Sequence, residues 1–327
     1  GMEKISTPAE GVVTGYGLVN GRGVFAFAHD FTVLGGAMGE MQGMKVKRMQ
    51  ELALDAGLPF VGLNDSGGAR IQEGPSTSYG NIFYNNVMAS GVIPQISAIM
   101  GPCAGGTVYS PALTDFILSV NGTSRSFITG PAVIKNVTGE IVDAETLGGA
   151  KTHNTLSGVS HFFCQDDADC IYKIKRLLSF FPANCRELPP VYACNDDPNR
   201  RCERLNTLVP ESLKKAYNIK EIIREIADEH DFLEVQELYA TNIVIGFIRL
   251  NGKSVGVVAN QPSMLAGCIE INASDKAARF IRTCDCFNIP LLSIVDVPGY
   301  LPGIKQELGG IIRHGAKMLY AWSEACL

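Results

Sequence analysis

The chain contains two copies of one sequence pattern, and this internal repeat limits its possible folds more than any other feature. Gly15-Tyr-Gly-Leu-Val-Asn-Gly21 returns as Gly246-Phe-Ile-Arg-Leu-Asn-Gly252. Identical residues recur at this same offset as far as Gly68 and Gly299; they include Val24 and Val255, Leu34 and Leu265, Lys45 and Lys276, Pro59 and Pro290, and Asp65 and Asp296. An ungapped match of this length predicts two copies of one fold unit in tandem.

Each copy is predicted to begin with a β-hairpin, because β-rich segments flank an Asn-Gly turn. A helix follows and ends at a Gly or Asn closely followed by Pro, which is a stop signal. A buried strand and a loop containing Gly then close the unit. The ranges are 11–19, 24–28, 39–56, 60–64 and 65–70 in the first copy, and 242–250, 255–259, 274–287, 291–295 and 296–300 in the second.

The first copy continues as alternating helices and strands. A helix is expected over 77–90, and strands over 93–100 and 115–119, separated by the glycine loop Gly101–Gly106. This alternation predicts an α/β fold with parallel strand pairing. We expect a first domain over residues 1–185, a linker rich in Pro, Asn and Asp over 186–210, and a second domain over 211–327. The second domain is expected to be incomplete, because the equivalent of Gly101 would lie beyond Leu327.

Composition narrows the class of protein. The chain is 46% hydrophobic and 19% charged, as in an ordered globular protein, and its net charge of −5 gives no reason to expect nucleic-acid binding. Its longest apolar runs are too short to cross a bilayer, so we expect no membrane insertion. There are ten cysteines, no CxxC pair and no visible signal peptide, which favours a cytoplasmic location. Cys185, Cys194 and Cys202 have no nearby His, and we expect no metal site.

The glycine loops that follow the buried strands are the candidate site. A glycine-rich turn between a strand and a helix exposes backbone N–H groups, and two such turns on adjacent strands can aim two N–H groups at one carbonyl oxygen. That arrangement is an oxyanion hole, and each donor contributes on the order of 3 kcal/mol to transition-state stability. The paired glycines Gly67-Gly68 and Gly105-Gly106 favour this interpretation, although either loop alone could simply be a tight turn.

Longer motifs around these loops give the chain a specific resemblance that covers nearly its whole length. The motifs lie at residues 30–36, 62–74, 90–96, 100–106, 109–115, 127–131 and 147–153 in the first half, and at 260–262, 296–303 and 309–317 in the second. On these motifs the chain resembles the acyl-CoA carboxyltransferase family, which includes the propionyl-CoA carboxylase β subunit and the methylmalonyl-CoA decarboxylase α subunit.

The resemblance implies two tandem crotonase-like domains, the first binding an acyl-CoA and the second binding carboxybiotin. It implies that N–H groups around Gly68, Ala69, Gly105 and Gly106 bind the thioester oxygen. The loop at Gly299 and Tyr300 would contribute to binding the biotin ureido oxygen. Implied partners are a biotin carboxyl carrier protein, a biotin carboxylase subunit and further copies of the chain in a hexamer. The family also has an N-terminal helical region, so we expect a chain truncated at both ends and inactive alone.

Four hypotheses about function remain open on sequence alone. The first is the carboxyltransferase of a biotin-dependent carboxylase acting on propionyl-CoA or a similar short acyl-CoA. The second is the corresponding subunit of a sodium-pumping decarboxylase with membrane partners, which runs the same chemistry in reverse. The third is a crotonase-type hydratase or hydrolase without biotin, and the fourth a non-catalytic CoA-binding fragment. No catalytic role is expected for His153, His161 or His314, and Arg70 and Lys151 are expected to form ordinary salt bridges.

Overall fold

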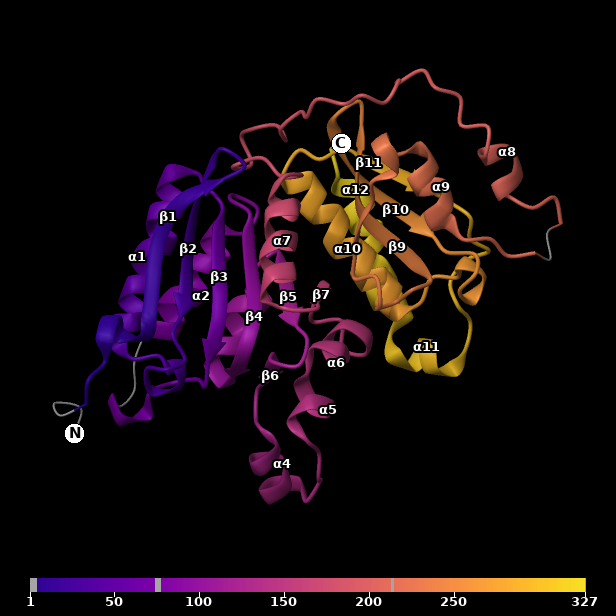
Figure 1. The fold of residues 1–327 in the computed structure, drawn as a ribbon. Helices are drawn as coiled ribbons and strands as arrows, with labels where there is room; N and C mark the ends of the chain where they lie inside the picture. Colours follow the sequence, from indigo (N-terminus) through magenta and orange to yellow (C-terminus); the bar gives the residue numbers. More distant parts are fainter. Residues whose placement is uncertain (1–4, 74–77, 213–214, 327) are drawn as a thin grey trace. The chain divides into compact units, whose positions relative to one another are not determined.

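The computed structural model describes residues 5–73, 78–212 and 215–326. The chain divides into two compact units, each with its own sheet (Figure 1). The first unit comprises Gly1–Leu178 with Ala183–Cys185, and the second comprises Ser179–Pro182 with Arg186–Leu327.

The first unit is a seven-stranded sheet with helices packed against it. Its strands run in the order β1-β2-β3-β4-β5-β7, and β6 pairs with β4. Strands β1 and β2 pair antiparallel, whereas the other pairs of this sheet are parallel. The strands are β1 (Val12–Val19), β2 (Arg22–His29), β3 (Phe60–Ser66), β4 (Gln95–Ala104), β5 (Phe116–Val120), β6 (Arg125–Phe127) and β7 (Phe162–Cys164). The α-helices are α1 (Glu40–Ala56), α2 (Ser78–Ala89), α3 (Tyr109–Leu113), α4 (Pro131–Thr138), α5 (Ala144–Gly148), α6 (Ala150–Thr155) and α7 (Asp167–Leu178).

The second unit has a four-stranded sheet in the order β11-β10-β9-β8. Its strands are β8 (Leu233–Val235), β9 (Ile243–Leu250), β10 (Lys253–Asn260) and β11 (Leu291–Ile294). Its α-helices are α8 (Leu205–Leu208), α9 (Ile219–Ile226), α10 (Ile271–Cys286), α11 (Ile304–Gly309) and α12 (Ile311–Glu324). Residues 186–204, within the expected linker, form neither helix nor strand.

The predicted repeat is visible element by element. Strand β1 starts at Val12 and β9 at Ile243, which are separated by the offset found in the sequence. Strands β2 and β10, helices α1 and α10, and strands β3 and β11 start at the same offset. Each copy also has a short 3₁₀ turn after its second strand, at Leu34–Gly36 and Leu265–Gly267. The expected α/β fold of two related units is therefore confirmed.

Capping residues and strand pairing explain where the helices and strands begin and end. Gly57 ends α1 in the left-handed conformation (φ 63°), as the stop signal predicts. The helix expected from residue 274 starts at Ile271, because the Glu270 carboxylate accepts hydrogen bonds from the Asn272 and Ala273 amides. Strand β4 extends to Ala104, where a loop was expected, because residues 102–104 pair with β6. The predicted helix start at Thr77 lies outside the described residues.

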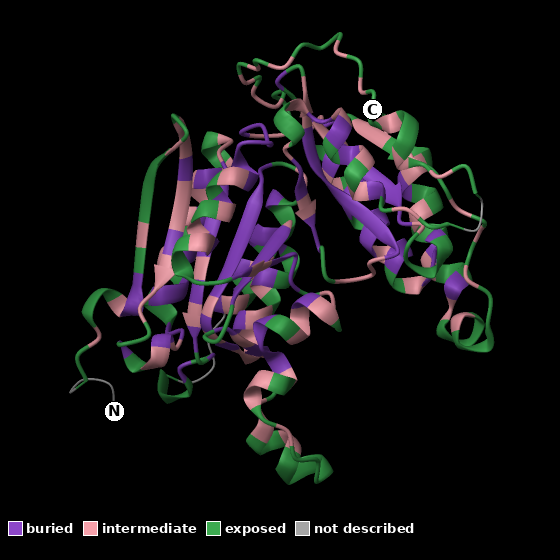
Figure 2. Cartoon of the chain, turned by 45° about the vertical axis from the view of Figure 1, so that its right-hand side comes forward, coloured by how far each residue is buried: buried purple, intermediate pink, exposed green. Residues whose placement is uncertain are grey.

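The core lies around the central strands of each unit. Strand β5 is buried along its whole length, and so are the first six residues of β9, whereas α4 has no buried residue (Figure 2). Helix α7 buries Cys170, Ile174, Leu177 and Leu178, whose spacing places them on one helical face. Packing of such faces, rather than helix propensity, positions the helices against the sheet.

Gly36 provides a test of this packing. Its φ is +63°, and a Cβ there would lie 2.2 Å from the Asp65 carbonyl oxygen; Gly267 faces Asp296 in the same way at 2.5 Å. Gly36→Ala should lower the free energy of unfolding by about 2–4 kcal/mol, through strain plus steric overlap. Gly21→Ala is the matched control, because Gly21 also has positive φ (+77°) but no atom within 4 Å of the added Cβ. Its cost should be only about 1 kcal/mol. Equal losses in urea unfolding would contradict the proposed packing.

Candidate active site

The two glycine loops of the first unit lie at the same edge of the sheet because they follow neighbouring parallel strands. Phe60 of β3 pairs with Gln95 of β4, and the register continues to Asn64 and Ile99. The register then shifts, so that Ser66 pairs with Cys103. This irregularity inserts additional β4 residues and brings the end of β4 level with the end of β3.

The two loops lie too close together for a side chain at either of two glycines. A Cβ on Gly68, whose φ is +114°, would lie 3.1 Å from the Ala104 carbonyl oxygen. Gly101, in the irregular part of β4, lies against the Asp65 carboxylate, 2.1 Å from where its Cβ would be. Both positions therefore require glycine for close approach, and Gly68 also for its backbone conformation.

The amides of the first loop differ in their hydrogen bonding. Gly67 N–H donates to Gly35 O at 2.9 Å, Gly68 N–H to Ser66 Oγ at 3.3 Å, and Arg70 N–H to Met38 O at 2.9 Å. Met38 and Ala69 form a parallel bridge, with Met38 N–H donating to Gly68 O at 2.8 Å. For Ala69 N–H, no acceptor is found in the described parts of the chain, and Ala69 is exposed.

The second glycine loop leads directly into a 3₁₀ turn. Gly105 and Gly106 are the first residues of a 3₁₀ turn, Gly105–Val108, so their N–H groups have no partner within that turn. Both glycines are half-buried. The structure thus brings together Gly68 and the loop of Gly105 and Gly106, with Ala69 as the donor of the first loop that is available to a ligand.

The loop at Gly299 and Tyr300 in the second unit repeats the first loop. Ile269 N–H donates to Gly299 O at 3.1 Å, and Leu301 N–H donates to Ile269 O at 2.8 Å. Ile269 and Tyr300 form the bridge that Met38 and Ala69 form at the equivalent positions of the first unit. Gly299 (φ +147°) faces open space, with nothing within 4 Å of an added Cβ, and Tyr300 is 41% exposed.

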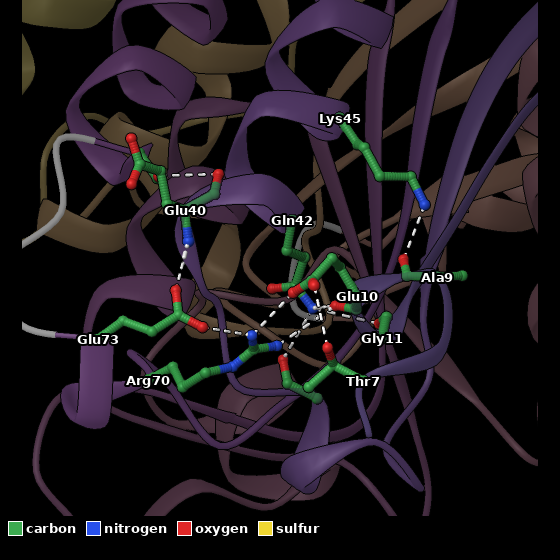
Figure 3. Close-up of polar contacts among 11 residues, drawn as sticks. Thr7, Ala9, Glu10, Gly11, Glu40, Gln42, Lys45, Arg70 and Glu73 are labelled. Atoms are coloured by element: carbon green, nitrogen blue, oxygen red, sulfur yellow. Dashed lines mark hydrogen bonds and ion pairs between the residues drawn. The ribbon is translucent and has the colours of Figure 1, made fainter. Parts of the chain in front are cut away.

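A charged cluster fixes the chain directly after Ala69. The Arg70 side chain, 1% exposed, donates to Glu10 Oε2 at 2.8 Å and Glu73 Oε1 at 2.6 Å (Figure 3). Glu73 Oε2 also accepts from the Glu40 amide at the start of α1, at 3.0 Å. The cluster therefore joins the N-terminal segment, α1 and the first glycine loop, and confirms the salt-bridge interpretation of Arg70.

Three titratable groups lie on the strands that lead into or flank the loops: His29 on β2, Asp65 on β3 and Cys103 on β4. Burial, with a smaller effect of Asp167 and Asp30, raises the pKa of Asp65. Burial lowers the pKa of His29 to about 4, so its Nδ1 can accept from the Asp65 amide at 3.3 Å as a neutral ring. Burial also raises the pKa of Cys103 to about 12, so this thiol is no nucleophile at neutral pH.

The three candidate histidines are engaged in structural contacts, whereas the exposed Lys151 forms no ion pair with any residue that the structure describes, so its expected salt bridge is not found. His161 Nδ1 accepts from the Ile117 amide at 3.0 Å, His153 contacts Ser157 Oγ and Ser126 O, and His314 contacts Asp275 at 2.6 Å. The ten cysteines all lie in the described ranges and none is in a disulfide. Over the described residues there is no His, Cys, Asp or Glu group suited to a metal ion, and no helix long and apolar enough to span a membrane.

Sequence reasoning missed Ser66 and Met38. Both act through hydrogen bonds to the main chain of Gly68. The Ser66 contact had a sequence signal, because a serine two residues before a turn glycine commonly accepts its amide hydrogen bond. The Met38 contact had none, because it is formed by the main chain alone.

Comparisons with known proteins agree on one family. A family model described as "Carboxyl transferase domain" matches residues 1–327. The chain is 59% identical, over 99% of its length, to the methylmalonyl-CoA decarboxylase subunit alpha of Veillonella parvula, and 54% identical, over 99%, to the propionyl-CoA carboxylase beta chain of Roseobacter denitrificans. It spans 64% of the length of each of these relatives. A transcarboxylase 12S structure, described as a hexamer with hydrolysed methylmalonyl-coenzyme A bound, superposes with a TM-score of 0.97 at 54% identity, covering 100% of this chain and 64% of that one.

The charged cluster predicts a pH dependence. The Glu40 amide and the Arg70 guanidinium hold the pKa of Glu73 below its usual value. A carboxylate with a lowered folded-state pKa stabilises the fold above its unfolded-state pKa, and this contribution is lost as pH falls through the folded-state value. Glu73→Gln should therefore destabilise the protein at pH 7, and its difference from wild type should shrink below about pH 4.

Urea unfolding between pH 3 and 7 measures this difference. Glu51→Gln is the control, because Glu51 forms exposed pairs with Lys47 and Arg48 on α1 and should change stability little. A Glu73→Gln difference that stays constant over the whole pH range would contradict the assignment.

Proposed function

The chain belongs to the carboxyl transferase domain family, and on that premise we propose that it catalyses carboxyl transfer between carboxybiotin and a short acyl-CoA, as the carboxyltransferase component of a biotin-dependent carboxylase. The observation that supports the proposal is the close approach of the two glycine loops: no acceptor is found for the Ala69 amide among the described residues, and Gly105 and Gly106 begin a 3₁₀ turn.

These amides suit the charge that the reaction develops. When the α-carbon of an acyl-CoA loses a proton or CO2, negative charge moves onto the thioester oxygen. Backbone N–H groups fixed by a sheet edge stabilise that charge without reorganising, and each donor is worth on the order of 3 kcal/mol. The reaction needs no side-chain nucleophile from this chain, which fits the structural roles of its histidines and the buried thiol of Cys103.

The substrate class rests on the relatives. They are named for propionyl-CoA and methylmalonyl-CoA, and the transcarboxylase 12S structures are described with methylmalonyl-coenzyme A or its hydrolysed form bound. We assign the first unit to the acyl-CoA and propose propionyl-CoA or a close homologue as the substrate, with methylmalonyl-CoA as the corresponding carboxylated form.

The loop at Gly299 and Tyr300 is the proposed biotin side. It repeats the backbone arrangement of the first loop, and the open space at Gly299 leaves room for a ligand's carbonyl oxygen beside the Tyr300 amide. Biotin, carried on a partner protein, supplies or accepts the carboxyl group. The chain's contribution there is a second hydrogen-bond donor site, for a ureido oxygen that takes on negative charge when CO2 leaves carboxybiotin.

The proposed partners follow from this role. They are a biotin carboxyl carrier protein, a biotin carboxylase subunit and further copies of the full-length chain, since the transcarboxylase relative is described as a hexamer. We propose a cytoplasmic location, which ten cysteines without a disulfide among them support.

The second candidate is the carboxyltransferase subunit of a decarboxylase, acting with membrane partners. The 59% identity to a methylmalonyl-CoA decarboxylase subunit, against 54% for the carboxylase chain, favours it. The amide geometry serves both directions equally, because the same enolate forms in each.

An exchange assay tests the proposal on the full-length protein. Incubation with methylmalonyl-CoA and free biotin should yield propionyl-CoA and carboxybiotin, measured by mass spectrometry. Ala69→Pro removes one amide donor and should lower kcat about 100-fold or more. Ala69→Ser, which keeps the amide, should stay near wild type. Absence of exchange with malonyl-, methylmalonyl- and glutaconyl-CoA would refute the function, and an active Ala69→Pro would refute the role of the amide.

A further inference from the structure

We propose that the Ser66 hydroxyl is a positioning group, which fixes the loop of Gly67, Gly68 and Ala69 so that only Ala69 presents its amide to the acyl thioester. This inference rests on the proposed function and deepens it, because it names a side chain on which the acyl-side donors depend.

Of the four consecutive amides from Gly67 to Arg70, only that of Ala69 has no acceptor among the described residues. Gly67 N–H donates to Gly35 O, Gly68 N–H to Ser66 Oγ and Arg70 N–H to Met38 O. Three of four consecutive amides are thus bound within the unit, and two of the three acceptors are main-chain carbonyls. The Ser66 hydroxyl is the only side-chain acceptor among them, and Ser66 is 0% exposed. Substitution of Ser66 can therefore remove its hydrogen bond to the loop. The bonds to Gly35 and Met38 use main-chain carbonyls, which a substitution leaves in place.

Crowding makes the Ser66 contact consequential. Gly68 is buried, with the Ala104 carbonyl 3.1 Å from the position of a Cβ. Without Ser66 Oγ, the Gly68 amide would be a buried donor with no acceptor, which is costly. We expect the loop to shift so that this amide finds another acceptor, and the Ala104 carbonyl of the second glycine loop already lies close to Gly68. Such a shift would move the Ala69 amide relative to Gly105 and Gly106, whose amides are proposed to bind the same thioester oxygen.

The second unit supports the assignment by contrast. Its equivalent of Ser66, at the offset of the repeat, is Val297, which has no hydrogen-bonding side chain. Gly299 there meets no neighbouring atom within 4 Å, whereas Gly68 is packed against Ala104. The backbone bridge is the same in both loops, so the hydroxyl is an addition specific to the crowded acyl side.

The experiment compares Ser66→Ala with Ser97→Ala in the full-length protein. Ser97 is also buried, at 4% exposed, and its Oγ accepts from Thr114 Oγ1 at 3.1 Å, so its loss removes one buried hydroxyl away from the loops. Both variants should lose similar thermal stability. Ser66→Ala should in addition lower kcat for methylmalonyl-CoA-to-biotin exchange by about 10- to 100-fold, with KM for methylmalonyl-CoA within about twofold of wild type. Ser97→Ala should leave kcat unchanged.

A further variant keeps the proposal testable if Ser66→Ala does not fold. Ser66→Cys retains the volume but offers a weaker acceptor, and should lower kcat in the same direction by a smaller factor. Hydrogen exchange of the Gly68 amide should be faster in either folded variant than in wild type. Wild-type kcat in a folded Ser66 variant, or an equal fall in Ser97→Ala, would overturn the role of Ser66. An inactive wild-type protein would instead refute the proposed function.

Discussion

The close approach of Gly68 to the Ala104 carbonyl is the constraint on which the candidate site depends. It exists because β3 and β4 are parallel neighbours and because the register shift before Ser66 brings the end of β4 level with the end of β3. Two loops that would otherwise end at different heights therefore meet, and a side chain at residue 68 would separate them. Beside that contact lie the Ala69 amide, for which no acceptor is found among the described residues, and the 3₁₀ turn that begins at Gly105 and Gly106.

In the proposed site, main-chain N–H groups act on the substrate and the surrounding side chains take no part in the chemistry. Arg70 is held in ion pairs with Glu10 and Glu73, His29 is neutral, and the Cys103 thiol is protonated. These groups hold the loops in place without offering a nucleophile or a strong base. Fixed amide dipoles can stabilise an enolate in this setting, because they are already oriented when the charge forms. The proposed function accordingly rests on position rather than on side-chain reactivity.

The sequence predicted the architecture well because the repeat supplied each element twice. The hairpins, the helix from residue 40 and the strand from residue 60 start close to the positions predicted from the alignment of the two copies. The register shift was not predictable, because it depends on how Gly101 packs against Asp65 in three dimensions. The start of α10 was also missed, because a side-chain cap from Glu270 decides it. The four glycine-loop residues were predicted from composition and resemblance, but the bond from the Gly68 amide to Ser66, and the lack of an acceptor for the Ala69 amide among the described residues, follow only from the fold.

The central claim is that Ala69 and the loop of Gly105 and Gly106 polarise one thioester carbonyl. Infrared difference spectroscopy of propionyl-CoA, ¹³C-labelled at the thioester carbonyl and bound to the full-length protein, measures this polarisation directly. We predict that the carbonyl stretching frequency falls below its value in water on binding, since fixed N–H donors weaken the C=O bond. A frequency equal to or above the aqueous value would show that the amides do not reach the oxygen, and would contradict the account.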